Sequence, residues 1–189
     1  MGSFFHRHRG VAPYLLLAPG ILWITFTFAA MLGLNRAFGL ERENRALDGL
    51  LLSPASRTAI YLGKVLANLV FVGAVEAIAL PLFALFFNVP ILPVLGPLVL
   101  VIALATVGFV AVGTLMSSMA VNTRFAELML PVLLLPFLVP PVTSAVQVTA
   151  RLFAGRPFSE GTAWLRLLVG YDIIFVAACI LFFESTIEE

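Results

Sequence analysis

The chain has 189 residues, of which 61% belong to the hydrophobic set and 11% are charged, and its mean hydropathy is +1.09. Ordinary soluble domains carry roughly 25% charged residues, so these few charges could not cover a water-exposed surface and most of the chain must lie in lipid. The formal net charge of +1 excludes the strongly basic surface that nucleic-acid binding requires.

The gaps between charged residues measure the predicted membrane spans, because about 20 apolar residues cross the hydrocarbon core of a bilayer. An uncharged stretch of 26 residues separates Arg9 from Arg36. The 59 residues between Lys64 and Arg124 hold one charge and must fold back once, at the two prolines of residues 88–93. We expect an all-α, polytopic membrane protein, a single transmembrane domain with five spans near residues 12–35, 64–87, 95–121, 128–148 and 165–183.

Three of these spans carry unusual residues. The first follows a basic tail, residues 1–11, but its apolar stretch is longer than that of a cleavable signal peptide. The last contains Arg166 and Asp172, so residues 159–170 form either part of a span or an amphipathic or re-entrant segment that leads into a shorter helix. A kinked or partly broken fourth span is indicated by four prolines, Pro131, Pro136, Pro140 and Pro141.

Lysine and arginine residues are biased toward one side of the predicted membrane protein. The loop between the first two spans, together with the later turn on the same side, collects six of them, and the opposite side collects four. By the positive-inside rule this bias places the 36–63 segment in the cytoplasm. With five spans, the N-terminal tail then lies on the other side of the membrane.

Residues 39–57 form an amphipathic stretch within that cytoplasmic segment. Its leucines recur at helical spacing and its charges, including the i,i+4 pair of Glu41 with Arg45, occupy the other side. This pattern predicts a surface helix up to Gly49 and then a second helix, capped by Ser53 and Pro54, that runs into the membrane. The stretch is either a solvated connection or, since loops with their own structure usually have a task, a docking surface for a soluble partner. The candidate docking residues are Glu41, Arg42, Arg45, Leu47, Leu50, Leu51 and Arg57.

Glu76 lies near the middle of the second span, twelve residues from both Lys64 and Asn88. A carboxylate at that depth is costly to expose to lipid, so we expect it to face other helices or a cavity. A structural hydrogen bond and a substrate-path or proton-linked role are both open. No metal site is predicted, because Cys179 stands alone in an apolar run and the two histidines, His6 and His8, lie in the tail.

Motifs of common enzymes are absent from the sequence. A phosphate-cradling loop of the form G-x4-G-K-[ST] would need glycine at Thr58 and serine or threonine at Val65. Neither H-E-x-x-H nor G-x-S-x-G occurs. We therefore expect no enzymatic activity in this chain.

Six short motifs are spread over the chain: residues 18–23 (APGILW), 38–43 (FGLERE), 50–57 (LLLSPASR), 60–64 (IYLGK), 80–83 (LPLF) and 171–175 (YDIIF). Together they resemble the haem exporter protein B family, which supplies the membrane permease subunit of the ABC transporter used in cytochrome c maturation. The resemblance covers nearly the whole chain from about residue 12.

This resemblance implies that the 36–63 segment is a coupling segment, which docks on a separate ABC ATPase subunit, in a fold similar to ABC-type polysaccharide and drug exporters. It implies the bacterial cytoplasmic (inner) membrane and other cytochrome c maturation membrane subunits as partners, and we expect a second permease copy. Members of the family usually have six spans, so we expect that the usual first span is missing here and is replaced by residues 1–10.

No cofactor is expected to bind this chain directly, since ATP would be held by the partner subunit. The only tryptophans, Trp23 and Trp164, lie in different spans, so no tryptophan-rich haem motif is present. The leading hypothesis is a permease subunit that acts in haem export or in the release of a haem-loaded chaperone. The alternatives are the permease of an exporter for a lipid-linked sugar or a drug, and a non-transporting membrane assembly scaffold.

Overall fold

The computed structural model describes residues 12–43, 56–120 and 126–186. In these ranges the chain forms five long helices, two short 3-10 helices and no strand. They are α1 (Ala12–Glu43), α3 (Arg57–Phe87), η2 (Leu92–Val94), α4 (Leu95–Ala120), α5 (Ala126–Phe153), η3 (Phe158–Gly161) and α6 (Thr162–Thr186). All five long helices are long and apolar enough to cross a membrane. The prediction of an all-α, polytopic membrane protein with five spans is therefore confirmed.

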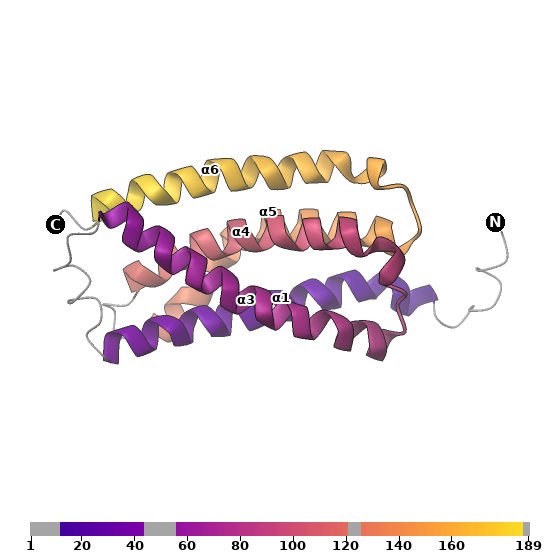
Figure 1. Cartoon of the computed structure of the whole chain (residues 1–189), viewed down its shortest axis with the longest axis horizontal. Coiled ribbons are helices and arrows are strands. Elements are labelled where there is room, and N and C mark those ends of the chain that lie inside the picture. The colour runs from indigo at the N-terminus through magenta and orange to yellow at the C-terminus, as the bar shows by residue number, and fades with distance from the viewer. Residues whose placement is uncertain (1–11, 44–55, 121–125, 187–189) are drawn as a thin grey trace.

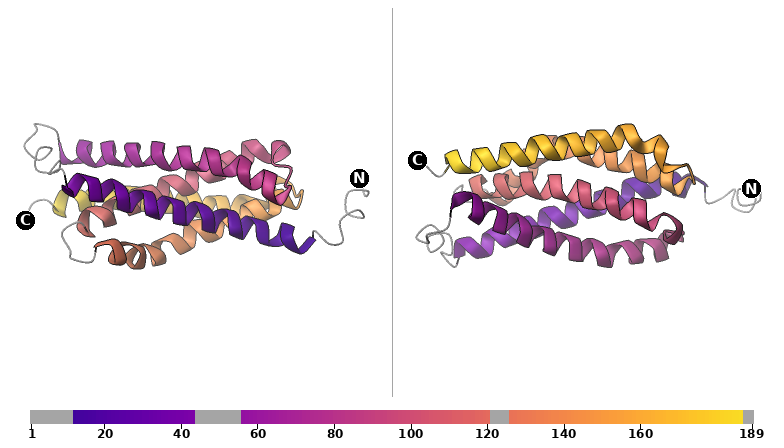
Figure 2. Two further views of the ribbon diagram at one scale, coloured as in Figure 1. Left: turned by 90° about the horizontal axis from the view of Figure 1, so that it is seen from below. Right: turned by 45° about the horizontal axis from the view of Figure 1, so that its top comes forward.

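The five long helices run alternately up and down along one axis and form an elongated bundle (Figures 1 and 2). One end of the bundle holds the Ala12 end of α1, the α3–α4 turn and the α5–α6 turn, and the other end holds the opposite helix ends (Figure 1). Helix α4 packs against each of the other four. Its span is 72% buried, against 22% for the spans of α3 and α6, so α4 is the central element.

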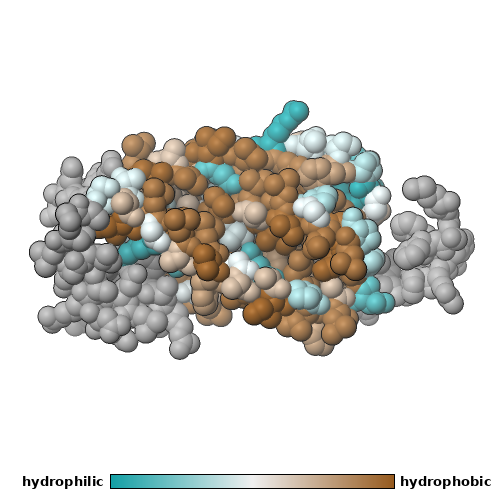
Figure 3. All heavy atoms as spheres, in the orientation of Figure 1, coloured by the Kyte–Doolittle hydropathy of each residue, from teal (hydrophilic) through white to brown (hydrophobic). Residues whose placement is uncertain are grey.

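The outer surface of the bundle is apolar. Hydrophobic side chains cover most of the middle of the face that Figure 3 shows. Large apolar residues with more than half of their surface exposed include Phe28 of α1, Leu66 and Phe86 of α3, Val132 of α5 and Ile173 of α6. Such a continuous apolar surface would be costly in water, whereas lipid solvates it.

Two helix ends differ from the sequence expectation. Helix α1 continues to Glu43, so the residues from 36 to 43 extend the first span as one helix and do not begin a separate surface helix. This stretch contains no proline and mostly good helix formers, so nothing stops the helix there. Helix α3 begins at Arg57, and its N-cap is Ser56, whose Oγ accepts a hydrogen bond from the Ala59 N–H at 3.2 Å. The prediction of Ser53 as the N-cap of this helix is therefore wrong.

The chain reverses direction between α3 and α4 at the proline-rich segment that the sequence singled out. Asn88 adopts the left-handed conformation, with φ 50° and ψ 41°, and its N–H bonds the Ala84 carbonyl. Asparagine tolerates this conformation, and a left-handed residue is a common way to end a helix. Pro90 and Pro93 follow at once, so α3 cannot continue.

Helices α5 and α6 are each continuous. Four prolines lie inside α5 without breaking it, so of the expected kinked or partly broken helix the break is excluded and the kink stays a prediction. Pro141 has no N–H to offer the Phe137 carbonyl one turn earlier, and the Tyr171 hydroxyl of α6 donates to that carbonyl instead, at 2.8 Å. Neighbouring helices can satisfy freed backbone groups in this way. Residues 162–186 likewise form one helix and not a re-entrant segment with a shorter helix.

Candidate functional site

Polar side chains inside the bundle are the candidate functional groups, because lipid offers them no hydrogen-bond partner and each must find one within the protein. The buried polar and charged residues of the described ranges are Lys64, Asn68, Glu76, Thr106, Thr114, Ser117, Ser144, Thr149 and Asp172. They lie on α3, α4, α5 and α6, and the central helix α4 carries three of them.

Glu76 points from α3 into the bundle and is 7% exposed. Its Oε1 accepts a hydrogen bond from the Thr106 hydroxyl of α4, with 2.8 Å between the two oxygens. The carboxyl therefore ties α3 to the central helix near the middle of both. Whether Glu76 also has a functional role stays a prediction.

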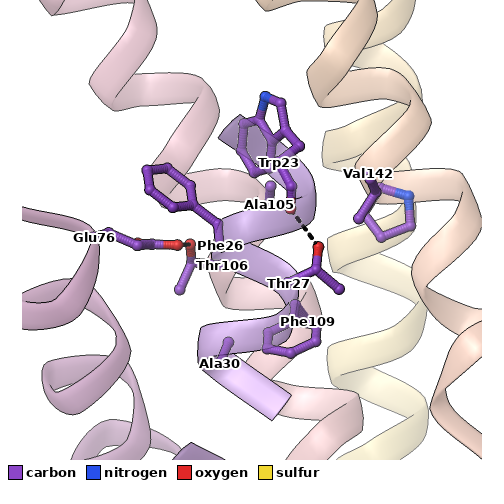
Figure 4. Close-up of a pocket in the computed structure, with 10 residues that line it drawn as sticks. Trp23, Phe26, Thr27, Ala30, Glu76, Ala105, Thr106, Phe109 and Val142 are labelled. Carbon is purple, nitrogen blue, oxygen red and sulfur yellow. Dashed lines mark hydrogen bonds between the residues drawn. The ribbon is translucent and has the colours of Figure 1, made fainter. Parts of the chain in front are cut away.

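A small cavity lies beside Glu76 where α1, α3, α4 and α5 meet (Figure 4). Its volume is about 20 Å³, and by the same measure one water molecule needs roughly 10–15 Å³. The lining residues are Trp23, Phe26, Thr27, Ala30, Glu76, Ala105, Thr106, Phe109, Pro141 and Val142. Pockets for drug-sized ligands measure roughly 300–1,000 Å³, so this conformation has room here for a water molecule but not for a haem.

Beside the cavity, one hydrogen bond links α1 to α5. The Trp23 Nε1–H donates to the Thr149 hydroxyl across the two helices at 3.0 Å. The Thr27 hydroxyl donates to the Trp23 carbonyl at 2.7 Å, within α1 (Figure 4). The cavity is therefore walled by helices that are bonded in pairs, α1 with α5 and α3 with α4.

Two further bonds hold α3 to α4 between the cavity and the Arg57 end of α3. The Asn68 side-chain amide donates to the Thr114 hydroxyl at 3.0 Å. The Tyr61 hydroxyl donates to the Ala111 carbonyl at 2.9 Å. Together with the bond at Glu76, they fix the register of α3 along α4.

Asp172 of α6 is a second buried carboxyl, and sequence reasoning did not select it as a site residue. It is 8% exposed, and neither carboxyl oxygen has a hydrogen-bond partner in the described part of the chain. It packs against Gly108 of α4, where an added Cβ would overlap Oδ1. An isolated charge in an apolar run marks both Glu76 and Asp172 in the sequence, but at Asp172 the pattern indicates only an interruption of the last span.

The predicted docking residues are only partly within the described ranges. Glu41 and Arg42 lie in the last turn of α1, and Arg57 is the first residue of α3, all at one end of the bundle. Arg45, Leu47, Leu50 and Leu51 lie outside the described residues. The structure thus brings the two flanks of the docking segment to the same end of the molecule. It describes neither the segment itself nor the side chains of these flanking residues.

Arginine side chains gather at the opposite end, around the α5–α6 turn. Arg151 donates to the carbonyl and the side-chain Oε1 of Gln147 and lies 6.0 Å from the Trp164 ring centre. Arg156 pairs with Glu160 at 3.5 Å on the surface. These contacts anchor the turn, and no group of three metal-ligating residues is found there or elsewhere in the described ranges.

Comparison with known proteins gives a consistent result. The profile of the family described as CcmB protein matches residues 12–187. The chain is 32% identical over 160 residues to heme exporter protein B of Rhodobacter capsulatus, covering 85% of this chain and 73% of that protein. For the Pseudomonas aeruginosa protein of the same name the identity is 29% over 154 residues, covering 80% and 68%. For that of Paracoccus denitrificans it is 31% over 143 residues, covering 74% and 63%. No solved structure matches the chain.

Proposed function

The chain belongs to the CcmB family, and from this premise we propose that it is the permease subunit of an ABC transporter that serves cytochrome c-type biogenesis. It would act in haem export or in the release of a haem-loaded chaperone, in the bacterial cytoplasmic membrane. The family match over residues 12–187, which includes most of every long helix, carries the proposal.

We place ATP hydrolysis in a separate ABC ATPase subunit that docks on residues 40–57. Two observations support this arrangement. The chain lacks a phosphate-cradling loop. Helix α1 ends at Glu43 and helix α3 begins at Arg57, at the same end of the bundle, so a movement of the docking segment would reach both helices directly.

The same two helices would carry that movement to the middle of the bundle. Along α1, Glu43 lies sixteen residues from Thr27 at the cavity, or about 24 Å at 1.5 Å per residue. Along α3, Glu76 lies nineteen residues from Arg57. The Glu76–Thr106 bond then connects α3 to the central helix, so α4 would move with α3.

Further membrane subunits complete the proposed transporter. A cavity of about 20 Å³ is far below the size of a haem, so this conformation offers no transport path at that place. We therefore place the transport path between two membrane subunits, where it need not fit within one chain. These would be two copies of this chain, or this chain with another cytochrome c maturation subunit. Direct haem binding by this chain is not part of the proposal.

The docking step is tested by co-purification. Leu50→Asp combined with Arg45→Glu removes an apolar contact and reverses a charge in the docking segment, so it should abolish retention of the ATPase subunit and stop cytochrome c production. The control, Ala154→Asp with Arg156→Glu, makes the same two kinds of change on exposed residues of the α5–α6 turn and should do neither. Wild-type retention and cytochrome c levels in the first variant would overturn the docking proposal.

Two measurements separate the proposal from its alternatives. In reconstituted membranes the chain should raise the turnover of the ATPase subunit, whereas an assembly scaffold would bind it without changing turnover. Deletion of the chain should abolish c-type cytochromes, whereas deletion of a sugar or drug exporter would leave them at the wild-type level.

A further inference from the structure

Asp172 is a buried carboxyl that the proposed function does not use. It lies within α6, ten residues from the helix start, with 8% of its surface exposed. Neither Oδ1 nor Oδ2 has a hydrogen-bond partner among the residues that the structure describes. Most other polar side chains at comparable depth are bonded, as Glu76 is to Thr106.

No cation pairs with this carboxyl in the described ranges, and the helices packed around it explain why. Helix α4, which faces it, has no ionisable residue anywhere between Leu95 and Ala120. Tyr171, which precedes Asp172 on α6, does not bond the carboxyl, because its hydroxyl donates a hydrogen bond to the Phe137 carbonyl of α5. The remaining charged or titratable groups on the surrounding elements are Arg57, Tyr61, Lys64 and Glu76 of α3, Glu127 and Arg151 of α5, Glu160 of η3, and Arg166, Cys179 and Glu184 of α6.

The contact at Asp172 is a close fit between two helices. A Cβ placed on Gly108 would overlap Asp172 Oδ1 and would lie 2.9 Å from Cε1 of the Tyr171 ring. The carboxyl and the ring edge therefore occupy the space that a side chain at position 108 would need. Helices approach closely in membranes where one of them presents a small residue.

An ionised carboxylate in this position would be an uncompensated charge in a medium of low dielectric constant, which is far more costly than the neutral acid. A metal cation does not resolve the problem. Hard cations need about six oxygen ligands, whereas α4 presents only a glycine to the carboxyl, and Asp172 Oδ1 lies where a side chain at position 108 would be. A proton is the ligand that fits.

We propose that Asp172 is a proton-binding site at the α4–α6 contact, occupied while the two helices are packed together and emptied when they separate and water reaches the carboxyl. No side-chain hydrogen bond joins α4 to α6 in the described residues, so separation there breaks none. That this separation accompanies transport rests on the proposed permease function.

Infrared spectroscopy of the complete chain in lipid nanodiscs tests the site without requiring transport. The C=O stretch of a neutral carboxyl lies apart from the carboxylate and amide bands. At neutral pH, Asp172→Asn should remove part of this band, and Glu160→Gln, which changes an exposed ion-paired carboxylate, should leave it intact. A band of wild-type intensity in Asp172→Asn means that Asp172 is ionised and overturns the proposal.

Hydrogen–deuterium exchange in heavy water tests the second part of the proposal, that Asp172 releases its proton when α4 and α6 separate. The O–H of a carboxyl that is shielded from water exchanges only when the two helices move apart. Gly108→Ala wedges α4 away from α6 and should speed the exchange of the Asp172 component. Gly170→Ala, on α6 itself and with open space at its Cβ, should leave the wild-type rate. If Gly108→Ala does not reach the membrane, Asp172→Glu presses a longer acid against the same glycine.

Equal exchange in the wedge variant and the wild type would overturn the link between proton release and helix separation. Neither infrared measurement depends on an ATPase subunit. Failure of the proton site is therefore distinguishable from failure of the permease proposal, which co-purification and cytochrome c production decide.

Discussion

The two contacts on opposite sides of α4 are built differently. Toward α3, three hydrogen bonds cross the interface, from Thr106 to Glu76, from Asn68 to Thr114 and from Tyr61 to the Ala111 carbonyl. Toward α6, the described side chains form no hydrogen bond, and the contact depends on the fit of Asp172 and Tyr171 against Gly108. Thr106 and Gly108 are two residues apart, about 200° around the helix, so the contrast lies at one depth.

This difference indicates which helix pair can move apart at lower cost. Hydrogen bonds across a membrane interface fix the register and are lost when the helices slide. A contact made by shape alone loses only packing, which lipid tails partly replace. We therefore expect α3 and α4 to move as one body and α6 to be the partner that leaves α4. Three perturbations test this expectation, from the largest effect to the smallest.

Overpacking the α4–α6 contact should have the largest effect. Gly108→Ala forces the Asp172 carboxyl and the Tyr171 ring to shift, and it should lower the free energy of unfolding by about 1–3 kcal/mol. Reversible unfolding in lipid bicelles measures this loss. Gly170→Ala is the control, because nothing lies within 4 Å of its added Cβ and no loss is expected. Equal stability of the two variants would show that α6 does not depend on this fit.

Breaking the α3–α4 hydrogen bond should have an intermediate effect. A double-mutant cycle of Glu76→Met and Thr106→Val should give a coupling energy between about 0.6 kcal/mol, the average for such bonds in membranes, and about 1.7 kcal/mol, their maximum. In the control cycle, Thr25→Val replaces Thr106→Val. Thr25 is exposed on α1 and bonds the Ile21 carbonyl within its own helix, so no coupling is expected. If the coupling energy between Glu76 and Thr106 were also zero, the proposed difference between the α3-facing and α6-facing sides of α4 would be wrong.

The bond that holds α6 to α5 should give the smallest effect. Tyr171→Phe should cost about 0.6 kcal/mol, because the Phe137 carbonyl loses its donor. In a Pro141→Ala background the cost should shrink, since the restored N–H at position 141 can bond the same carbonyl. The cost should persist in a Pro131→Ala background, where position 137 gains no donor. Identical costs in all three backgrounds would contradict the role assigned to Pro141.

The sequence was sufficient to predict the helices because charge spacing and apolar length reflect the solvent of each segment. The 59-residue interval with one charge required a reversal, and the structure turns there at Asn88. Helix ends were harder to predict. Ser53 and Ser56 are both plausible N-caps, and only the backbone geometry selects Ser56. The continuation of α1 to Glu43 was missed because amphipathic spacing cannot distinguish a new surface helix from the extension of an existing one.

The buried polar groups show the same limit. A single carboxyl in a long apolar stretch is easily recognised in the sequence, and because its exposure to lipid is costly, Glu76 is expected to face inward. Its partner Thr106, thirty residues away, follows only from the packing of α3 on α4. At Asp172 the decisive neighbour is Gly108, a residue without a side chain. In α5, the prolines suggested a break, whereas Tyr171 of another helix supplies the donor that keeps the Phe137 carbonyl satisfied.

The length of α1 makes it a lever arm. Its apolar window ends at Leu34, yet the helix runs on to Glu43, nine residues or about 14 Å farther along its axis. The Trp23–Thr149 bond ties α1 to α5 near the cavity, twenty residues from the Glu43 end. If α1 tilts about that bond, the Glu43 end sweeps an arc several times longer than the one at Thr27 or Ala30. In such a tilt, α1 would convert a large displacement at its Glu43 end into a small displacement at the Glu76 cavity.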